Sequence, residues 1–319
     1  MSATILITDY GFKNVEVERG IVERAGFVLR TAQCRTPAEV IAAAQDADAV
    51  IVQWAPIDAS VIAALPSRVR VVVRYGIGVD NIDLDAAAAR GLPVCNVPDY
   101  CVDEVADHSL ALALSLARQL PQTHARTLAG EWKITPPAPM PAFRDMTFVC
   151  AGFGRIARLV LGRARAFGFK LAAYDPFVKP EVFAAEGVSQ LSLEELFGAA
   201  DILSLHLPLS PATRHFVNAS RLRAMKATSV VVNSSRGGLI DTEALARALI
   251  AGELAGAGVD VFETEPLPAG HPLRAAPNIV LTSHTAWFSE ASVPRLQRLA
   301  AEEAVRALRG EPLKNRLGG

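Results

Sequence analysis

The sequence predicts an α/β protein with two doubly wound parallel sheets, one of which belongs to a discontinuous domain. Short apolar runs alternate with segments of helix-spaced apolar residues over residues 5–97, and the alternation restarts near residue 147. Such repeated β-α alternation is typical of a parallel sheet with helices on its faces. A single amphipathic segment, residues 289–310, follows the second block and is too short to form a domain. We therefore predict one domain over residues 1–98 and 288–319, and a second, inserted domain over residues 99–287.

The first block contains the elements of one sheet. It opens on the strand-like run ILIT, and a helical segment that stops at Gly26 follows. Three helix–strand pairs come next, namely AEVIAAAQDAD with AVIVQW, DASVIAALP with VRVVVRYG, and LDAAAARG with LPVCNV. No turn in this block has the glycine spacing that cradles a phosphate. The block therefore predicts a sheet without a nucleotide-binding turn.

A long apolar helix and a proline-rich segment separate the two blocks. We predict the helix from about residue 102 to 119, ended by Pro121, and its run HSLALALSLARQL is more apolar than one solvated face needs. We expect that run to be buried in a subunit or domain contact. The second block has predicted strands at TFVCAG, KLAAYD, DILSLHLP, SVVVNSS, GAGVDVF and NIVLTSH, with helices between them.

The composition argues against several classes of protein. The apolar fraction of 51% is ample for two cores, and a formal net charge of −1 gives no basic surface for nucleic acid. The N-terminus lacks the regions of a signal peptide, and no stretch of about 18 apolar residues avoids charge. We interpret the four cysteines, Cys34, Cys95, Cys101 and Cys150, as reduced core thiols, because they show no CxxC spacing. We expect a cytoplasmic protein without a metal, a membrane or a nucleic-acid partner.

The stretch VCAGFGRIARLV, residues 149–160, has the form of a dinucleotide-binding turn between a strand and a helix. Gly152 makes the tight turn, Gly154 lets the backbone approach a pyrophosphate, and Ala157 supplies the small residue that close helix–strand packing needs. The amides and dipole of the following helix would face the phosphates. The predicted contacts from this turn are Gly152, Phe153, Gly154, Arg155 and Ile156.

Asp175 indicates which dinucleotide binds. It ends the next predicted strand, 21 residues after Gly154, where an acidic residue hydrogen-bonds a ribose 2′-hydroxyl. A 2′-phosphate beside that carboxylate would be repelled. The surrounding run YDPFVKP has no arginine, and its only base is Lys179. The sequence therefore favours NAD over NADP.

Three segments at the ends of later strands each carry one chemically useful residue. They are NSSRGGL with Arg236, DVFETEP with Glu265 and TSHTAW with His284. A guanidinium grips a carboxylate with two parallel hydrogen bonds, a histidine exchanges a proton near neutral pH, and an adjacent glutamate orients the ring. Each residue also has a structural interpretation, as a loop cap, a surface acid and a core histidine. Together they suit hydride transfer at a carbon that bears oxygen and lies next to a carboxylate.

These motifs resemble, in order and spacing, those of D-isomer-specific 2-hydroxyacid dehydrogenases. The matching stretches are GFGRIAR, YDP, LHLPLSPATRHFVN, VVNSSRGGLID, GAGVDVFETEPL, NIVLTSHTAW and RYGIGVDNIDLDAAAARGLPVCNVP. The resemblance covers nearly the whole chain, and its branch is C-terminal-binding-protein-like or phosphoglycerate-dehydrogenase-like. It implies two Rossmann-like domains, with NAD on residues 99–287 and the substrate on the flavodoxin-like remainder. The family's catalytic residues fall on Arg236, Glu265 and His284.

The resemblance also implies residues that bind substrate and cofactor. Backbone amides of Tyr75, Gly76, Ile77 and Gly78 would meet the substrate carboxylate, although the glycines also serve as turn formers. Trp287 would wall the substrate pocket, or pack between domains. The implied cofactor contacts beyond the turn and Asp175 are Val105, His206, Pro208, Thr213, Ser234, Ser235, Arg236, Asp260 and His284. Core packing is the alternative for Val105, and a structural role is the alternative for His206.

The implied reaction is hydride transfer between NAD and C2 of a 2-oxo or D-2-hydroxy acid. Arg236 and the RYGIG amides would hold the carboxylate, and His284, kept protonated by Glu265, would protonate the carbonyl oxygen. Because the family is typically dimeric through its nucleotide domain, we expect a homodimer. The alternative is an NADH-sensing, corepressor-like module with vestigial catalysis. The sequence does not select among glyoxylate, hydroxypyruvate, 3-phosphohydroxypyruvate and branched 2-oxo acids, and phosphite oxidation also stays open.

Overall fold

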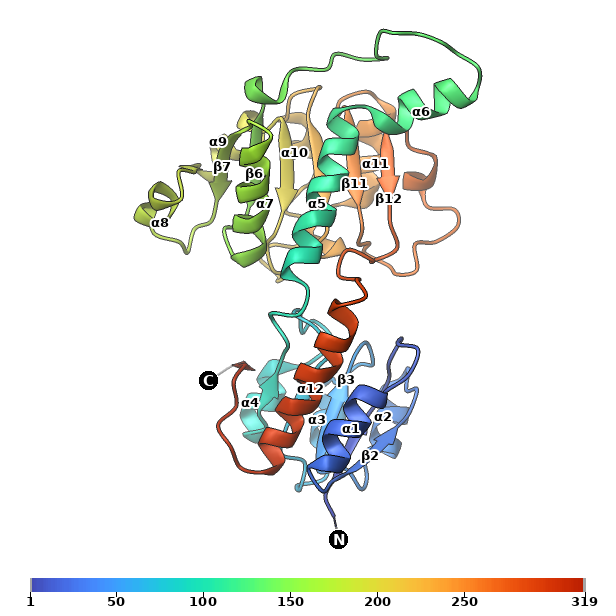
Figure 1. Cartoon of the computed structure of the whole chain (residues 1–319), viewed down its shortest axis with the longest axis vertical. Helices are drawn as coiled ribbons and strands as arrows, with labels where there is room; N and C mark the ends of the chain where they lie inside the picture. The colour runs from blue at the N-terminus through green and yellow to red at the C-terminus, as the bar shows by residue number, and fades with distance from the viewer. Residues whose placement is uncertain (1, 318–319) are drawn as a thin grey trace. The chain divides into compact units, whose positions relative to one another are not determined.

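The computed structural model describes residues 2–317 and contains two compact units (Figure 1). One unit joins the chain up to Cys101 with the part from Phe288 onward, and the other is Val102–Trp287. Met1, Gly318 and Gly319 lie outside the described residues, and with them the outermost positions of the predicted discontinuous domain. Each unit has its own sheet, so the predicted α/β class with two parallel-dominated sheets is confirmed.

The first unit has a six-stranded sheet in the order β13-β5-β4-β3-β1-β2. Neighbouring strands are parallel, except that β13 pairs antiparallel with β5. The strands are β1 (Thr4–Ile7), β2 (Val28–Thr31), β3 (Ala49–Val52), β4 (Val72–Arg74), β5 (Val94–Cys95) and β13 (Arg316–Leu317). The helices are α1 (Glu16–Arg24), α2 (Pro37–Ala43), α3 (Ala59–Ala64), α4 (Leu84–Arg90) and α12 (Ser292–Leu308).

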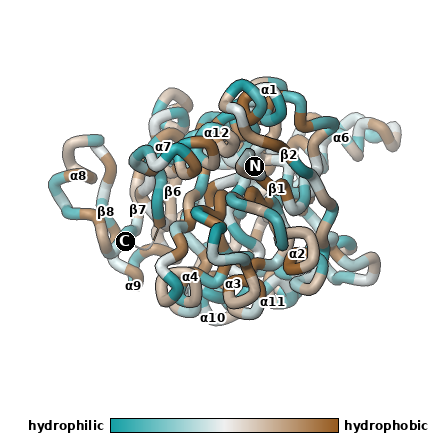
Figure 2. Tube along the Cα trace, turned by 90° about the horizontal axis from the view of Figure 1, so that it is seen from below, coloured by the Kyte–Doolittle hydropathy of each residue, from teal (hydrophilic) through white to brown (hydrophobic). Residues whose placement is uncertain are grey.

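Helices cover both faces of this sheet. On one face α1 and α12 lie side by side, and α12 also contacts β3 and β4 (Figure 1). On the other face Val40 of α2, Val61 of α3 and Ala87 of α4 join one buried cluster with Val50 and Val72 of the sheet. Figure 2 shows hydrophilic residues on the outer turns of α1, as expected for a helix with one apolar face. The last helix of the chain therefore completes the core of the first unit.

The second unit has a seven-stranded, fully parallel sheet in the order β12-β11-β10-β9-β6-β7-β8. Its strands are β6 (Thr147–Ala151), β7 (Lys170–Tyr174), β8 (Ser189–Gln190), β9 (Ile202–Leu205), β10 (Val230–Asn233), β11 (Gly256–Val259) and β12 (Ile279–Leu281). Its helices are α5 (Val102–Ala117), α6 (Leu120–Leu128), α7 (Arg155–Ala166), α8 (Pro180–Ala185), α9 (Leu193–Ala199), α10 (Ala219–Arg223) and α11 (Thr242–Ile250). Three 3₁₀ turns are Phe143–Asp145, Gly237–Leu239 and Pro272–Ala275.

The strand order of the second sheet reverses between β6 and β9. The chain runs outward from β6 through β7 to β8, then returns to β9 on the other side of β6. In open parallel sheets, ligands bind beyond the carboxyl ends of the strands at such a reversal. β6 ends at Ala151 and β9 at Leu205. The glycine turn and the segment that begins with His206 therefore lie where a ligand is expected.

The helix predicted from about residue 102 to 119 corresponds to α5, but the part given to Pro121 was wrong. α5 ends at Ala117, Gln119 has a φ of 50° in the left-handed region, and Pro121 lies in the first turn of α6. Proline is tolerated at a helix start because the first amides have no partner within the helix. Pro121 thus belongs to the first turn of the second helix, and the first helix ends before the left-handed Gln119.

The apolar run of α5 packs within its own unit. Leu112 and Leu116 lie against β11, where a Cβ added to Gly258 would come 2.9 Å from the Cβ of Leu112. α5 also packs on α7 and β10. The sheet therefore accounts for the buried residues of this run, and a second subunit is not needed to cover them.

Several short elements were not predicted from the sequence. They are β2, β8, β13, α6, α8 and α10, none longer than the nine residues of α6. Such short segments offer too few residues for a periodic pattern. The four cysteines are free and buried, which confirms their interpretation as core thiols. No helix within residues 2–317 combines the length and apolar character that a membrane crossing requires.

Candidate active site

Three loops begin side by side at the carboxyl edge of the second sheet. β10, β11 and β12 are adjacent and parallel, and Asn233, Val259 and Leu281 at their ends are in register. The loops that follow carry, in turn, the three residues predicted to be catalytic. The register of the sheet therefore gathers these loops at one edge.

Glu265 and His284 form a hydrogen-bonded pair. Glu265 Oε2 lies 2.7 Å from His284 Nδ1, and each side chain is 36% exposed. Glu265 Oε1 also accepts the Phe262 amide at 2.9 Å. Partial burial pushes the pKa of Glu265 upward, but the bonds from His284 and Phe262 outweigh it and hold that pKa below its usual range. Glu265 is therefore a carboxylate that orients the His284 ring through Nδ1. Nε2 is the other polar atom of that ring.

A turn built on Asp260 holds the backbone of His284. The Asp260 carboxylate accepts the Thr285 amide at 2.9 Å, the Ala286 amide at 3.0 Å and the Thr282 hydroxyl at 2.5 Å. The Asp260 carbonyl accepts the His284 amide at 2.7 Å. These bonds fix a turn in which His284 has a φ of 56°, a conformation that residues with a side chain seldom adopt. Asp260 is fully buried, so the structure gives it a positioning part, while its predicted contact with the nicotinamide stays a prediction.

His108 of α5 lies against this turn. Its Nε2 is 3.0 Å from Thr282 Oγ1 and 3.6 Å from Asp260 Oδ1. Because Thr282 Oγ1 donates to Asp260, the His108 ring completes the set of polar groups around the buried carboxylate. The structure therefore places His108 behind the turn that carries His284.

Gly237 lets the Arg236 loop lie directly on the loop of Glu265. A Cβ at Gly237 would overlap the backbone of Phe262, so only glycine fits there. The Arg236 carbonyl accepts the side-chain amide of Asn233 at 2.9 Å. The Arg236 side chain is half-buried, and its Nη1 donates to the Ser235 carbonyl at 2.8 Å. The loops of Arg236 and Glu265 are thus in contact.

Three predicted cofactor residues are engaged within the protein. Ser234 Oγ lies 2.6 Å from Ser109 Oγ, and Ser235 Oγ donates to the Leu207 carbonyl at 2.8 Å. Val105 is buried on α5. The two hydroxyls join the β10 loop to α5 and to the β9 loop, and the burial of Val105 favours core packing.

The glycine turn has the geometry that the motif predicts. Gly152 has a φ of 95°, and a Cβ there would lie 2.6 Å from the carbonyl oxygen of His206. Gly154 precedes α7, and a Cβ added there would meet open space. Ala157 is fully buried in the cluster that α7 forms with the sheet. The turn and the N-terminus of α7, which the N-cap residue Gly154 leaves without a side-chain cap, therefore fit the diphosphate of a dinucleotide.

The other residues of the turn differ in exposure. Phe153 is buried and stacks on Phe183, with ring centroids 4.4 Å apart. Arg155 is exposed and Ile156 is half-buried at the start of α7. Asp175 Oδ2 accepts the Phe153 amide at 2.9 Å, and its Oδ1 accepts the Phe177 amide at 3.0 Å. The Asp175 carboxylate is thus anchored beside the turn, and its predicted contact with a ribose stays a prediction.

The segment after β9 borders the same turn. His206 Nε2 lies 2.9 Å from Ser204 Oγ, and burial lowers the pKa of His206 to about 4, so the ring is neutral at pH 7. Thr213 Oγ1 donates to the Pro208 carbonyl at 2.6 Å. Pro208 itself is exposed. His206 therefore has a structural bond, and its backbone rather than its ring meets the glycine turn.

In the first unit, the RYGIG loop follows β4. The Tyr75 amide donates to the Val52 carbonyl at 2.8 Å, and the Gly76 amide donates to the Arg74 carbonyl at 2.9 Å. Within residues 2–317 the amides of Ile77 and Gly78 donate to no protein acceptor. Of the four amides predicted to meet a carboxylate, only these two are therefore available.

Tyr75 is held by a buried network. Its ring is 1% exposed, and its hydroxyl donates to Glu18 Oε1 at 2.6 Å. Glu18 Oε2 accepts the side-chain amide of Gln297 at 3.0 Å. Burial raises the pKa of Glu18, and the bonds from Tyr75 and Gln297 partly oppose that rise. The network ties α1 and α12 to the loop.

Some features lie apart from these groups. Trp287 is half-buried at the end of the second unit. Among the described residues, no cluster of His, Cys, Asp and Glu has an arrangement that would hold a metal.

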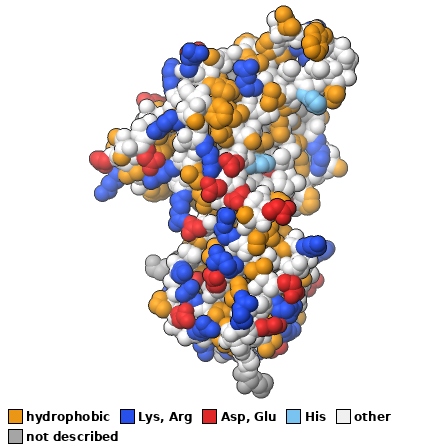
Figure 3. Space-filling model, in the orientation of Figure 1, with side chains coloured by type: hydrophobic (Ala, Val, Ile, Leu, Met, Phe, Trp, Pro, Cys, Tyr) orange, Lys and Arg blue, Asp and Glu red, His pale blue; other side chains and the backbone are white. Residues whose placement is uncertain are grey.

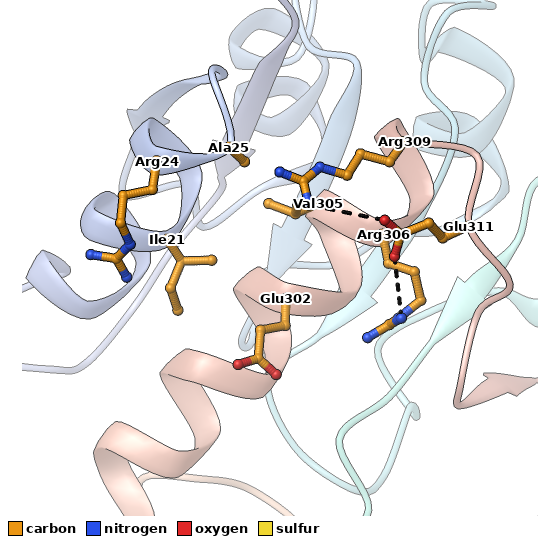
Figure 4. Close-up of a pocket in the computed structure, with 8 residues that line it drawn as sticks. All are labelled: Ile21, Arg24, Ala25, Glu302, Val305, Arg306, Arg309 and Glu311. Carbon is orange, nitrogen blue, oxygen red and sulfur yellow. Dashed lines mark hydrogen bonds and ion pairs between the residues drawn. The ribbon is translucent and has the colours of Figure 1, made fainter.

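Figure 4 shows a surface groove of the first unit between α1 and α12, in which Arg306 and Arg309 pair with Glu311. No predicted site residue lines that groove.

Comparison with known proteins identifies the family. A family model described as "D-isomer specific 2-hydroxyacid dehydrogenase, NAD binding domain" matches residues 110–286. A glyoxylate reductase of Korarchaeum cryptofilum is 37% identical over 276 residues, which are 85% of this chain and 83% of that protein. The chain belongs to the D-isomer-specific 2-hydroxyacid dehydrogenase family. It is therefore an oxidoreductase with a domain for a nicotinamide dinucleotide, and the predicted membership is confirmed.

Other relatives of this 2-hydroxyacid dehydrogenase agree. A D-3-phosphoglycerate dehydrogenase of Mycobacterium bovis is 39% identical over 274 residues, which are 86% of this chain but 51% of that protein. The chain thus spans about half the length of that relative. A D-lactate dehydrogenase of Aquifex aeolicus, solved with NAD and lactic acid, has a TM-score of 0.87 at 26% identity and covers 96% of both chains. These names agree with the phosphoglycerate-dehydrogenase-like branch and do not favour the corepressor-like alternative.

Proposed function

We propose that the protein interconverts a 2-oxo acid and a D-2-hydroxy acid by hydride transfer at C2, with NAD as cofactor. The observation that carries the proposal is the Glu265–His284 pair, 2.7 Å apart at the edge of the sheet that holds the glycine turn. The reaction needs a group that moves a proton to or from the substrate oxygen, and a carboxylate-oriented imidazole does so near neutral pH. The names of the relatives support a 2-oxo acid as the substrate class.

Turnover against a panel of 2-oxo acids tests this proposal. NADH and the purified protein are mixed with glyoxylate, hydroxypyruvate, 3-phosphohydroxypyruvate and a branched 2-oxo acid, and NADH absorbance is followed. We expect turnover of at least one of these acids, with a D-configured product wherever C2 becomes a stereocentre. Tight NADH binding without turnover of any acid would contradict the proposal and favour a sensing module.

We propose that His284 gives a proton to the substrate during reduction. Glu265 accepts the Nδ1–H, so the proton on Nε2 is available to the carbonyl oxygen. The nicotinamide, when bound, supplies the hydride that C2 receives. One hydride and one proton convert C=O to CH–OH, and in the reverse direction Nε2 takes the hydroxyl proton back.

We propose that Arg236 grips the substrate carboxylate through two parallel hydrogen bonds. From the first unit, the amides of Ile77 and Gly78 would assist, because they have no acceptor among the described residues. Tyr75 would then support the loop through its hydroxyl, and its amide would stay in the sheet. Trp287 as a wall for an apolar substrate side chain also remains a proposal.

We propose that NAD is preferred over NADP because of the Asp175 carboxylate. At an effective dielectric constant of 20, two like charges 4 Å apart repel by about 4 kcal/mol, and each 1.4 kcal/mol is about tenfold. After solvent screening we expect kcat/KM with NADH to exceed that with NADPH by at least about tenfold. Asp175→Asn keeps an acceptor for the Phe153 amide but removes the charge. It should therefore lower the ratio of kcat/KM with NADH to kcat/KM with NADPH.

The control for this comparison is Glu181→Gln. Glu181 is an exposed acid on α8, six residues along the chain, and its replacement removes one negative charge without touching the turn. That variant should keep the wild-type preference. Wild-type kcat/KM with NADPH equal to or above the value with NADH would overturn the preference for NAD.

We propose that the protein is a homodimer formed through the second unit. Exposed apolar side chains gather on α6 and the segment after it, where Trp132 is 85% and Ile134 is 94% exposed (Figure 3). Leu120 and Leu128 of α6 are exposed as well. An apolar surface of this kind marks an interface in many soluble proteins.

We also propose that the protein is located in the cytoplasm. Its four free cysteines suit a reducing compartment, which supports that location.

Sedimentation at micromolar concentration is expected to give twice the 33.9 kDa chain mass. The double variant Trp132→Glu, Ile134→Glu should sediment as a monomer, because it places two charges in the apolar surface. Ile250→Glu, on an exposed apolar residue at the end of α11, should leave the dimer intact. A monomeric wild type would contradict the proposal.

A further inference from the structure

A second carboxylate, Glu263, joins the loops at the carboxyl edge of the second sheet. Its Oε1 lies 2.6 Å from His215 Nε2 and 3.5 Å from Arg214 Nη2. Its Oε2 accepts the Thr242 hydroxyl at 2.8 Å and the Thr242 amide at 3.2 Å. His215 follows β9, Thr242 begins α11 after β10, and Glu263 follows β11. One side chain therefore binds segments from three successive β-α connections.

The hydrogen bonds around Glu263 have a consistent direction. His271 Nδ1 accepts the Leu273 amide at 3.2 Å, so its Nε2 carries the proton and faces Thr242 Oγ1 at 3.3 Å. Thr242 in turn donates to Glu263. Partial burial raises the pKa of Glu263, but the bonds from His215 and Thr242 more than offset that and hold the pKa below its usual range. Glu263 is thus an ionised acceptor surrounded by donors.

The segments that Glu263 binds are those that carry the proposed catalytic residues. The Arg236 loop lies on the backbone of Phe262 and Glu263 through Gly237. The His215 amide also donates to the Gly238 carbonyl at 2.8 Å, which ties the β9 connection to the same loop. Glu265 is two residues beyond Glu263. A displacement of Glu263 would therefore move both the guanidinium and the carboxylate that orients His284.

We propose that Glu263 is a positioning residue that sets Arg236 and Glu265 in their places for turnover. This inference rests on the proposed function. Glu263 acts through other residues, because protein donors occupy both of its oxygens. Its effect lies in the geometry of the reacting groups, where a misplacement of about 1 Å can cost about 10²-fold in rate.

Three variants test this inference by kinetics with a 2-oxo acid. Glu263→Ala removes the acceptor, and we expect kcat/KM to fall by about 10- to 10²-fold through both kcat and the KM for the acid. Glu263→Gln should stay within about threefold of wild type, since its amide oxygen can accept from Thr242 and His215 can change tautomer to accept from its amide nitrogen. His215→Asn removes one donor while tolerating the left-handed backbone at φ 50°, and should show a smaller loss than Glu263→Ala.

The control is Glu243→Gln, on an exposed acid of α11 that pairs with Arg247. It should behave as wild type. In every variant the Kd for NADH should stay within about twofold of the wild-type value, because the glycine turn lies on other strands. Loss of folded protein would instead lower both the amount of NADH bound and the activity.

The outcomes separate the inference from the proposed function. If wild type and Glu243→Gln turn over a 2-oxo acid while folded Glu263→Ala keeps kcat and KM within twofold, the positioning role is excluded. If Glu263→Ala does not fold, wild-type kinetics in His215→Asn would exclude it equally. If the wild type itself turns over none of the acids, the proposed function is contradicted, and so is the inference that rests on it.

Discussion

Replacing His284 with alanine is expected to lower kcat for 2-oxo-acid reduction by about 10²–10⁴-fold, the usual worth of a positioned acid or base. The substrate oxygen gains negative charge as the hydride arrives, and His284 Nε2 is the proton donor proposed for it. Water is a weaker and unoriented replacement. NADH binding should persist, because the glycine turn and Asp175 lie on other strands. Steady-state kinetics and a fluorescence titration of NADH measure the two quantities.

The same variant should change the titration of Glu265. In the wild type the pKa of Glu265 is low because bonds from His284 and the Phe262 amide outweigh partial burial. Without the imidazole, burial remains and the stronger bond is lost, so the pKa of Glu265 should rise. A carboxyl-carbon NMR titration of wild type and variant would detect that shift.

The sign of the pH effect follows from the same pair. A carboxyl whose folded pKa lies below its ordinary value of 4.5 adds stability above that pH, and the added stability disappears as pH falls through the folded pKa. The Glu265 contribution to stability should therefore be constant at neutral pH and be lost only in acid.

The control for the kinetics of His284→Ala is His124→Ala, on an exposed residue of α6, which should keep wild-type kcat. Near wild-type kcat in His284→Ala would remove His284 from the proton-donor role.

The sequence alone predicted the edge on which these residues lie. Parallel strands have a fixed direction, so residues that follow successive strands lie at one edge whatever the connecting helices do. Arg236, Glu265 and His284 could therefore be grouped before any coordinates, and β10, β11 and β12 are indeed adjacent and in register. The glycine turn was predictable for a related reason, since Gly152 needs a left-handed φ and Ala157 needs to be small.

The groups that support the site could not be predicted in that way. Glu263 meets His215 across 48 residues of sequence, and Glu18 meets Tyr75 across 57. No periodic pattern links such distant positions, because the contact exists only once the sheet is assembled. The letters ETEP do show two acids, but nothing local says that Glu263 faces His215 while Glu265 faces His284.

The break between α5 and α6 shows another limit of local reasoning. Proline ends a helix from within but is favoured in a first turn, so Pro121 fits either interpretation. The choice depends on Gln119, whose side chain donates to the carbonyls of Ala138 and Pro139 on the loop that returns to the sheet. That tertiary contact accompanies a left-handed backbone at a residue whose own preference is helical.

Replacing Arg236 is expected to have the second large effect, on kcat/KM for the 2-oxo acid. Truncating one partner of a buried, hydrogen-bonded charge pair costs about 2–5 kcal/mol, which corresponds to roughly 30- to several-thousand-fold in kcat/KM. Arg236→Gln should fall in that range, mainly through a higher KM, because it removes the charge that meets the carboxylate. Arg236→Lys keeps the charge but loses the planar fork, and should lie between the Gln variant and the wild type.

The pattern across substrates distinguishes a carboxylate clamp from a structural role for Arg236. A clamp predicts that the loss disappears when the substrate has no carboxylate, so a keto compound that is a poor substrate of the wild type should be reduced about as well by Arg236→Gln. A loop defect predicts equal losses for both compounds. Arg247→Gln, which breaks an exposed ion pair with Glu243 on α11, should leave both reactions unchanged. The Arg236 backbone is held by Asn233 and by the close approach of Gly237 to Phe262, and both contacts survive these substitutions. An equal loss of kcat/KM for the two compounds would therefore place Arg236 outside substrate binding.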